Sequence, residues 1–169
     1  MQHTLDLNLA WYRRNFRDNY DTVKMVRTVL EKMDGQFPDA SCPKATRLLL
    51  ELLPNVTLMC GTFKNKAMGK PAFHVWVFDM DAKVHIDITA DQFPIKTTSK
   101  LLFFRAGDTA LLESVGYRLA TLQVWNELFD IGPFSTFPLS KMKLTYDGKE
   151  TLEDVYKEVR RRLRGASPL

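Results

Sequence analysis

The sequence predicts an α+β fold, with helices first, then a small antiparallel sheet, then helices again. Apolar residues recur at helical spacing in residues 5–53, alternate in short segments within residues 56–89, and return to helical spacing after residue 91. The chain has 169 residues, 45% of them hydrophobic, which is enough for a sizeable core. No linker rich in Pro, Gly or Ser divides it, so we expect one domain over residues 1–169.

The helical region before the sheet contains a cysteine at a helix start. Residues 5–33 predict two helices or one broken helix, and an Asp-Gly pair ends this region. A further amphipathic helix is expected over residues 43–53, because Pro43 suits a first helical position and a second proline follows the last leucine. Cys42 therefore stands at the amino end of a helix.

Three strands are expected at residues 56–62, 72–78 and 84–89. The last two form a hairpin that turns through residues 79–82. Because the second strand has apolar residues on both faces, we expect it inside the sheet. After the sheet, helical spacing is clearest in residues 109–129 and 151–164.

Composition and charge do not indicate a nucleic-acid-binding, disulfide-rich, metal-binding or membrane protein. The net charge of +4 is spread over both signs, so nucleic-acid binding is not indicated, and the arginines at 160–164 suit the end of a helix. Two cysteines are too few for a disulfide framework, and no Cys/His spacing indicates a metal site or cofactor. The first residues resemble neither a signal peptide nor a membrane span. We expect a reduced, cytoplasmic setting, with delivery by a secretion system or by lysis left open.

Cys42 is a candidate nucleophile. A helix amino terminus stabilises a thiolate through free backbone N–H groups and the helix dipole. Cys42 lies between Ser41 and Pro43, at an element boundary rather than inside an apolar run. Cys60 lies within a strand-like apolar run and is interpreted as a small buried hydrophobic residue.

His74 is the candidate base for Cys42, and Asp87 is the group that would orient it. A hairpin centred near residues 80 and 81 places positions 74 and 87 close to opposite each other, on strands about 4.8 Å apart. His85 shares a face with Asp87 and is the competing base. Its offset along the same strand makes it a poorer hydrogen-bond partner for the carboxylate.

The order of these residues resembles the transglutaminase-like and NlpC-type branches of the papain-like superfamily of cysteine enzymes. The resemblance is carried by Ser41-Cys42-Pro43, by FHVWV at residues 73–77, and by HIDITADQF at residues 85–93. The chain is also similar to a group of bacterial and phage-type proteins with FP before a cysteine, HxW and IDITADQF. The resemblance covers residues 36–93 and implies a papain-like fold with a Cys-His-Asp triad.

Further site residues follow from that resemblance and from position in the chain. Papain-like enzymes use a glutamine six residues before the nucleophile as an oxyanion donor, which implies this role for Gln36, with Gln92 as the alternative. Trp76 is expected either in the core or in the substrate cleft, and Gln92 either at the cleft or as a cap of its loop. The loop at 64–70 is either a lip over the site or an ordinary solvated loop.

These residues predict a cysteine amidase, peptidase, glutamine deamidase or transglutaminase that acts through a thioester. Its partner would be a protein or peptide that offers an amide or a glutamine side chain. Two alternatives stay open: a non-catalytic peptide-binding module on the same frame, and an effector that modifies a host protein. The sequence does not choose among substrates and indicates no oligomeric state.

Overall fold

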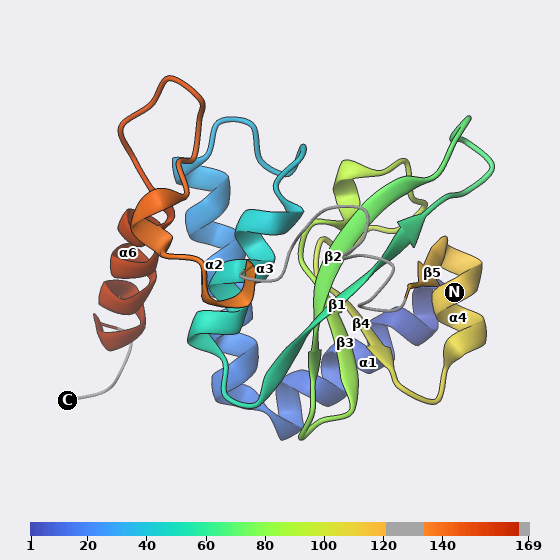
Figure 1. The fold of residues 1–169 in the computed structure, drawn as a ribbon. Helices are drawn as coiled ribbons and strands as arrows, with labels where there is room; N and C mark the ends of the chain where they lie inside the picture. Colours follow the sequence, from blue (N-terminus) through green and yellow to red (C-terminus); the bar gives the residue numbers. More distant parts are fainter. Residues whose placement is uncertain (121–133, 166–169) are drawn as a thin grey trace.

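The computed structural model describes residues 1–120 and 134–165. Within these ranges the chain is α+β, with five helices and a curled antiparallel sheet of five strands, as the sequence predicts for its class (Figure 1). Short 3-10 turns occur at Ala90–Gln92, Phe134–Thr136 and Leu139–Lys141.

The amino-terminal region forms two helices, α1 (Gln2–Asn15) and α2 (Arg17–Met33). They meet at Phe16, whose non-helical backbone (φ −132°, ψ 56°) separates them without a proline or glycine. The apolar residues of α2 recur at helical spacing and are buried, which gives this helix a continuous core-facing stripe. They are Val23, Val26, Val29 and Leu30.

Helix α3 (Cys42–Leu52) begins at the candidate nucleophile, with Ser41 as its N-cap and Pro43 in its first turn. The expected start and the observed start therefore agree to within one residue. Buried Ala45, Leu48 and Leu49 lie on one side of α3, and the helix packs against strands β2 (Ala72–Asp79) and β1 (Val56–Phe63). This packing brings the amino end of α3 to the sheet.

The strand order is β4-β3-β2-β1-β5, and all neighbours are antiparallel. The remaining strands are β3 (Val84–Asp87), β4 (Leu102–Arg105) and β5 (Tyr117–Leu119). Strand β2 lies between β3 and β1, which confirms the expected inner position of the segment that carries His74.

The carboxy-terminal part differs from the prediction. The sequence analysis expects helix throughout residues 109–129, but α4 spans only Thr109–Val115 and β5 follows directly. Gly116, at φ 138°, ends α4, and β5 then pairs with β1. Pairing between distant segments thus outweighs the local helical spacing at β5. The same holds for β4, a strand that the sequence analysis does not predict. Residues 121–129 of the expected helix lie outside the described ranges. The last helix, α6 (Leu152–Gly165), confirms the prediction for residues 151–164.

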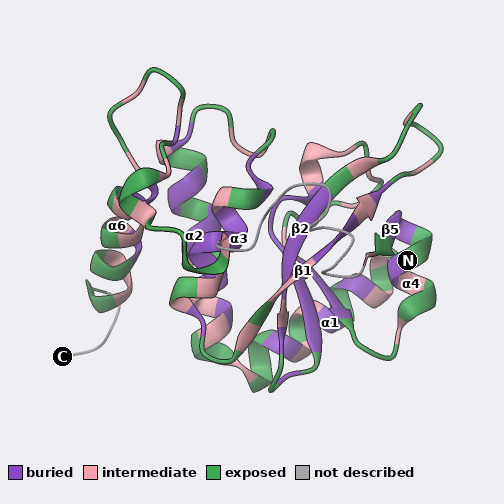
Figure 2. Ribbon diagram, in the orientation of Figure 1, coloured by how far each residue is buried: buried purple, intermediate pink, exposed green. Residues whose placement is uncertain are grey.

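Strands β2 and β3, in the middle of the sheet, are mostly buried (Figure 2). Val77 and Ile86 face a core shared with α2, α3 and α6. Trp76 and Phe104 point to the other face, in a second core with α4 and the start of α1. Because side chains alternate along β2, His74 shares the face of Trp76.

Candidate active site

Cys42 lies at the junction between helix α3 and the sheet. Its side chain packs in a small buried cluster with Cys60 and Val75, and the residue is 8% exposed. As the first residue of α3, it is next to backbone N–H groups that have no intrahelical acceptor. Those N–H groups and the helix dipole favour negative charge at this position.

A buried carboxylate organises the loop that leads to Cys42. Asp34, 1% exposed, accepts hydrogen bonds from the Gln36 backbone N–H at 3.1 Å and from the Ser41 hydroxyl at 3.2 Å. Asp34 also forms an ion pair with the Lys44 ammonium in the first turn of α3. The side chain of Asp34 therefore holds both ends of the loop at 34–41 together and ties the loop to α3.

His74 and Asp87 form a buried pair, as the sequence predicts. The Nε2 atom of His74 lies 2.6 Å from Oδ2 of Asp87, and neither residue is more than 2% exposed. The register differs from the expected one, because Phe78 pairs with His85, which would place residue 89 opposite residue 74. His74 and Asp87 are thus diagonal neighbours on one face, a separation that long side chains bridge.

The environment of His74 favours its charged form. Burial opposes protonation, but the charge and hydrogen bond of Asp87 outweigh it, Cys42 adds to their effect, and the pKa of His74 rises to about 10. Among the described residues, Nδ1 of His74 is buried and has no hydrogen-bond partner. Because Asp87 occupies Nε2, Nδ1 is the ring nitrogen that stays available to Cys42, which is among the groups that raise the pKa of His74.

Asp87 is held as a carboxylate by several donors. Besides His74, it accepts hydrogen bonds from the Thr89 backbone N–H at 2.8 Å, the Thr89 hydroxyl at 3.1 Å and the Tyr117 hydroxyl. Burial raises the pKa of Asp87, but the charge of His74 and these hydrogen bonds outweigh it, so the pKa is lowered.

No family model matches the chain, and neither a curated protein nor a solved structure matches it. The resemblance to papain-like enzymes therefore stays a prediction.

Tyr117 is a site residue that the sequence analysis missed. It is buried on β5, and glycines allow its placement: a Cβ atom on Gly61 would lie 2.0 Å from the Arg118 carbonyl oxygen, where β5 pairs with β1. A Cβ atom on Gly116 would lie 2.9 Å from the Phe63 ring. No local pattern indicates the contact of Tyr117 with Asp87, which joins residues 30 apart.

Aromatic rings enclose the imidazole. Trp76 lies 5.6 Å from the ring of His74, and Phe93 meets the His74 ring edge-on at 4.9 Å. Trp76 is 2% exposed, so it belongs to the core and does not line an open substrate cleft. Its indole N–H donates to Nδ1 of His85 at 3.1 Å. Burial lowers the pKa of His85 to about 4, so His85 is a neutral acceptor and is not placed as the base.

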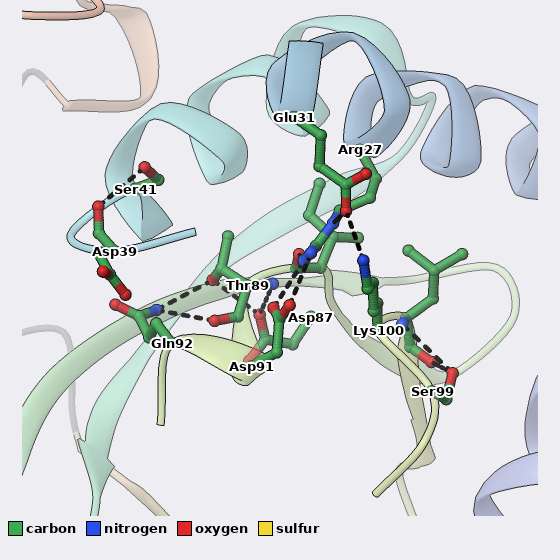
Figure 3. A network of polar contacts seen from close by, with 12 residues as sticks. Arg27, Glu31, Asp39, Ser41, Asp87, Thr89, Asp91, Gln92, Ser99 and Lys100 are labelled. Atoms are coloured by element: carbon green, nitrogen blue, oxygen red, sulfur yellow. Dashed lines mark hydrogen bonds and ion pairs between the residues drawn. The ribbon is translucent and has the colours of Figure 1, made fainter. Parts of the chain in front are cut away.

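The two candidate oxyanion glutamines lie in different settings. Gln36 is on the exposed turn before Cys42, and only its backbone has a described hydrogen bond within the site, to Asp34. Gln92 is half-buried and folds back on Thr89, donating to its carbonyl oxygen at 3.0 Å and to its hydroxyl at 3.3 Å (Figure 3). Gln92 thus caps its own turn, the second of its two expected roles.

Arg27 joins the two sides of the site, and the sequence analysis did not single it out. From α2 it donates to the Ile88 carbonyl oxygen and to both carboxylate oxygens of Asp91, each at 2.6 Å (Figure 3). Its guanidinium also lies 4.6 Å from the centroid of the Phe37 ring, in the loop before Cys42. One buried cation therefore contacts both the segment after Asp87 and the loop before the nucleophile.

In residues 1–120 and 134–165, no helix combines the length and apolarity needed to cross a membrane. The same part contains no group of three or more His, Cys, Asp or Glu side chains arranged to hold a metal ion.

Proposed function

We propose that the chain is a cysteine hydrolase or acyltransferase that acts on an amide through a thioester, on a papain-like or transglutaminase-like frame. One observation carries this proposal: a buried imidazole is fixed at Nε2 by Asp87, while its Nδ1 is left for Cys42 at a helix start. A helix that begins at the cysteine and packs on an antiparallel sheet carrying His and Asp on adjacent strands supports the frame.

The first half of the proposed reaction is acylation. His74 is charged and carries a proton at Nδ1, so the Cys42 sulfur is paired with it as a thiolate and attacks the amide carbonyl carbon. The tetrahedral intermediate carries a negative oxygen, which the Cys42 backbone N–H and the Gln36 side chain would stabilise. When the C–N bond breaks, the leaving amine takes the proton from Nδ1 and a thioester remains.

The second half regenerates the thiolate and the charged ring. Water attacks the thioester carbonyl while the neutral His74 accepts its proton, and the Cys42 sulfur leaves as a thiolate beside the protonated ring. Water gives peptide hydrolysis or glutamine deamidation, and an amine in its place gives transamidation. The proposed substrate is accordingly a protein or peptide with a reactive amide or glutamine side chain.

The test of the nucleophile uses iodoacetamide labelling of the native protein against pH. We expect fast labelling that disappears in Cys42→Ala and persists in Cys60→Ala, because burial raises the pKa of the Cys60 thiol. His74→Gln should move the labelling profile to higher pH, and His85→Gln should leave it unchanged. Slow labelling of Cys42 with no response to His74→Gln would overturn the proposal.

Acyl transfer needs a separate test, because alkylation requires no oxyanion stabilisation. With p-nitrophenyl acetate we expect a burst of p-nitrophenolate, one per molecule, as the acetyl group passes to Cys42. Gln36→Ala should slow this burst by about 10²-fold while leaving the iodoacetamide rate unchanged. If wild type and Gln36→Ala had the same burst rate, Gln36 would have no part in the mechanism, and the proposed roles of Cys42, His74 and Asp87 would be unaffected.

The burial of Cys42 favours one alternative, a peptide-binding module without chemistry. Cys42 is 8% exposed, and it does not line the cavity of about 850 Å³ that the described residues form. This alternative predicts no burst and an ordinary thiol profile, together with unchanged peptide binding in Cys42→Ala. The two proposals therefore differ in both experiments.

A further inference from the structure

A cavity of about 850 Å³ opens at one end of the sheet, away from the Cys42 site. Its walls come from the end of β1 and the loop after it, the segment that follows Phe93, the end of α4, Arg118 of β5 and the start of the chain. None of Cys42, His74 and Asp87 lines it. The loop at 64–70, which the sequence analysis considered as a lip over the active site, contributes residues 64–67 to this cavity instead.

The cavity combines an apolar wall with a cationic rim. The apolar wall includes Leu5, Ile95 and Val115. Four cationic residues line the cavity against a single carboxylate, that of Glu113, and within the described ranges none of the four forms an ion pair. These cationic residues are Lys64, Lys66, Lys96 and Arg118.

Hydrogen bonds fix the walls relative to one another. Asn65 donates from its side-chain amide to the Pro94 carbonyl oxygen at 2.8 Å, which joins the 64–67 loop to the opposite wall. The Lys64 backbone N–H donates to the Gly116 carbonyl oxygen at 2.9 Å, and Arg118 donates to the Glu113 carbonyl oxygen at 2.9 Å. The cavity is therefore built by cross-links between separate segments, as preformed ligand sites usually are.

We propose that this cavity binds an alkyl carboxylate, with the chain against the apolar wall and the carboxylate among the lysines. The volume falls in the usual range for small-ligand sites. An excess of cations beside an apolar wall favours a ligand with one anionic end, because the lysines attract the carboxylate while the chain leaves water. The proposal is independent of the chemistry at Cys42.

Titration calorimetry with dodecanoate below its micelle concentration tests the site on the full chain. Dodecyltrimethylammonium, which has the same chain with a cationic end, is the matched ligand. We expect dodecanoate to bind with one site per molecule and the ammonium compound to bind at least tenfold more weakly. Equal binding of the two ligands, or no binding of dodecanoate, would overturn the proposal.

Variants locate the binding. Lys64→Glu combined with Lys96→Glu should weaken dodecanoate binding at least tenfold, whereas Lys149→Glu, an exposed lysine elsewhere, should change it less than twofold. Ala67→Trp, at the exposed lip, fills the cavity without altering charge and should also weaken binding tenfold. Thermal unfolding verifies that each variant is folded. Binding that survives both the double variant and Ala67→Trp would place the ligand elsewhere and overturn the assignment.

Discussion

The two sides of the candidate active site are held in different ways. On the base side, Asp87 accepts four hydrogen bonds, and the contacts from His74 and Tyr117 span 13 and 30 residues. On the nucleophile side, Asp34 gathers groups that lie only 2, 7 and 10 residues further along the chain. His74, the proposed base, is therefore positioned by the assembled sheet, whereas the loop before Cys42, the proposed nucleophile, is positioned by a local turn.

Because of this difference, we expect variants on the two sides to affect stability in different ways. A variant on the base side should destabilise the whole sheet, because three strands meet at Asp87. A variant on the nucleophile side should chiefly loosen the loop at 34–41 and the start of α3.

Asp87→Asn should have the largest effect. It removes one partner of a buried ion pair and leaves His74 without its charge partner, so we expect the free energy of unfolding to fall by about 3–5 kcal/mol. Urea unfolding at pH 7 measures this loss. The exposed Asp147→Asn is the matched control and should change stability by less than about 0.5 kcal/mol. A loss below about 1 kcal/mol at Asp87 would mean that the sheet does not depend on the pair.

Arg27→Met should follow, because this cation contacts both sides of the site. The change keeps much of the apolar side-chain volume but leaves Asp91 and the Ile88 carbonyl oxygen without their donor, for an expected loss of about 3 kcal/mol. The matched control is Arg17→Met, whose pair with Asp21 is exposed and worth at most about 1 kcal/mol. Iodoacetamide labelling of Cys42 should also change in Arg27→Met alone. Unchanged labelling would show that Arg27 supports the fold without coupling the two sides.

The contrast also explains what the sequence could predict. The start of α3 at Cys42 is a local feature, set by a proline and a following apolar stripe, and it was predicted to within one residue. The pairing of His74 with Asp87 was predicted because one hairpin joins them, although the register is shifted by two residues. Tyr117 was missed because its strand pairs with β1 across more than 50 residues of chain, and its local sequence reads as helix. Arg27 was missed because nothing in the sequence around it distinguishes it from the other arginines in predicted helices.

The pH dependence of stability should report on the base side. The pKa of His74 is about 10 in the folded protein, above its ordinary value near 6.5. The stabilisation by the charged ring is therefore complete below about pH 6.5 and is lost as the pH rises toward 10, with a slope of at most about 1.4 kcal/mol per pH unit. Urea unfolding at pH 7 and pH 9 should show this decline in wild type. In His74→Gln the decline should be absent, and an equal decline in both proteins would assign it to other groups.

Asp34→Asn should loosen the nucleophile side with a smaller loss of stability. The amide keeps an acceptor for the Gln36 N–H or the Ser41 hydroxyl but loses the charge that pairs with Lys44, so we expect about 2 kcal/mol. Hydrogen exchange should accelerate most in residues 34–44. Equal acceleration across β2 and β3 would contradict the idea that this loop is a local unit.

Tyr117→Phe should give the smallest change and the sharpest test of the base side. It removes one donor to Asp87 without changing the shape of the core, so we expect a loss of about 1.5 kcal/mol, against none for the exposed Tyr146→Phe. Because this hydrogen bond lowers the pKa of Asp87, its loss should raise that pKa and extend the acid unfolding of the protein to higher pH. A purely structural role for the tyrosine would lower stability equally at all pH values. A pH-dependent loss would show that Tyr117 acts through the charge of Asp87, and therefore on the group that orients His74.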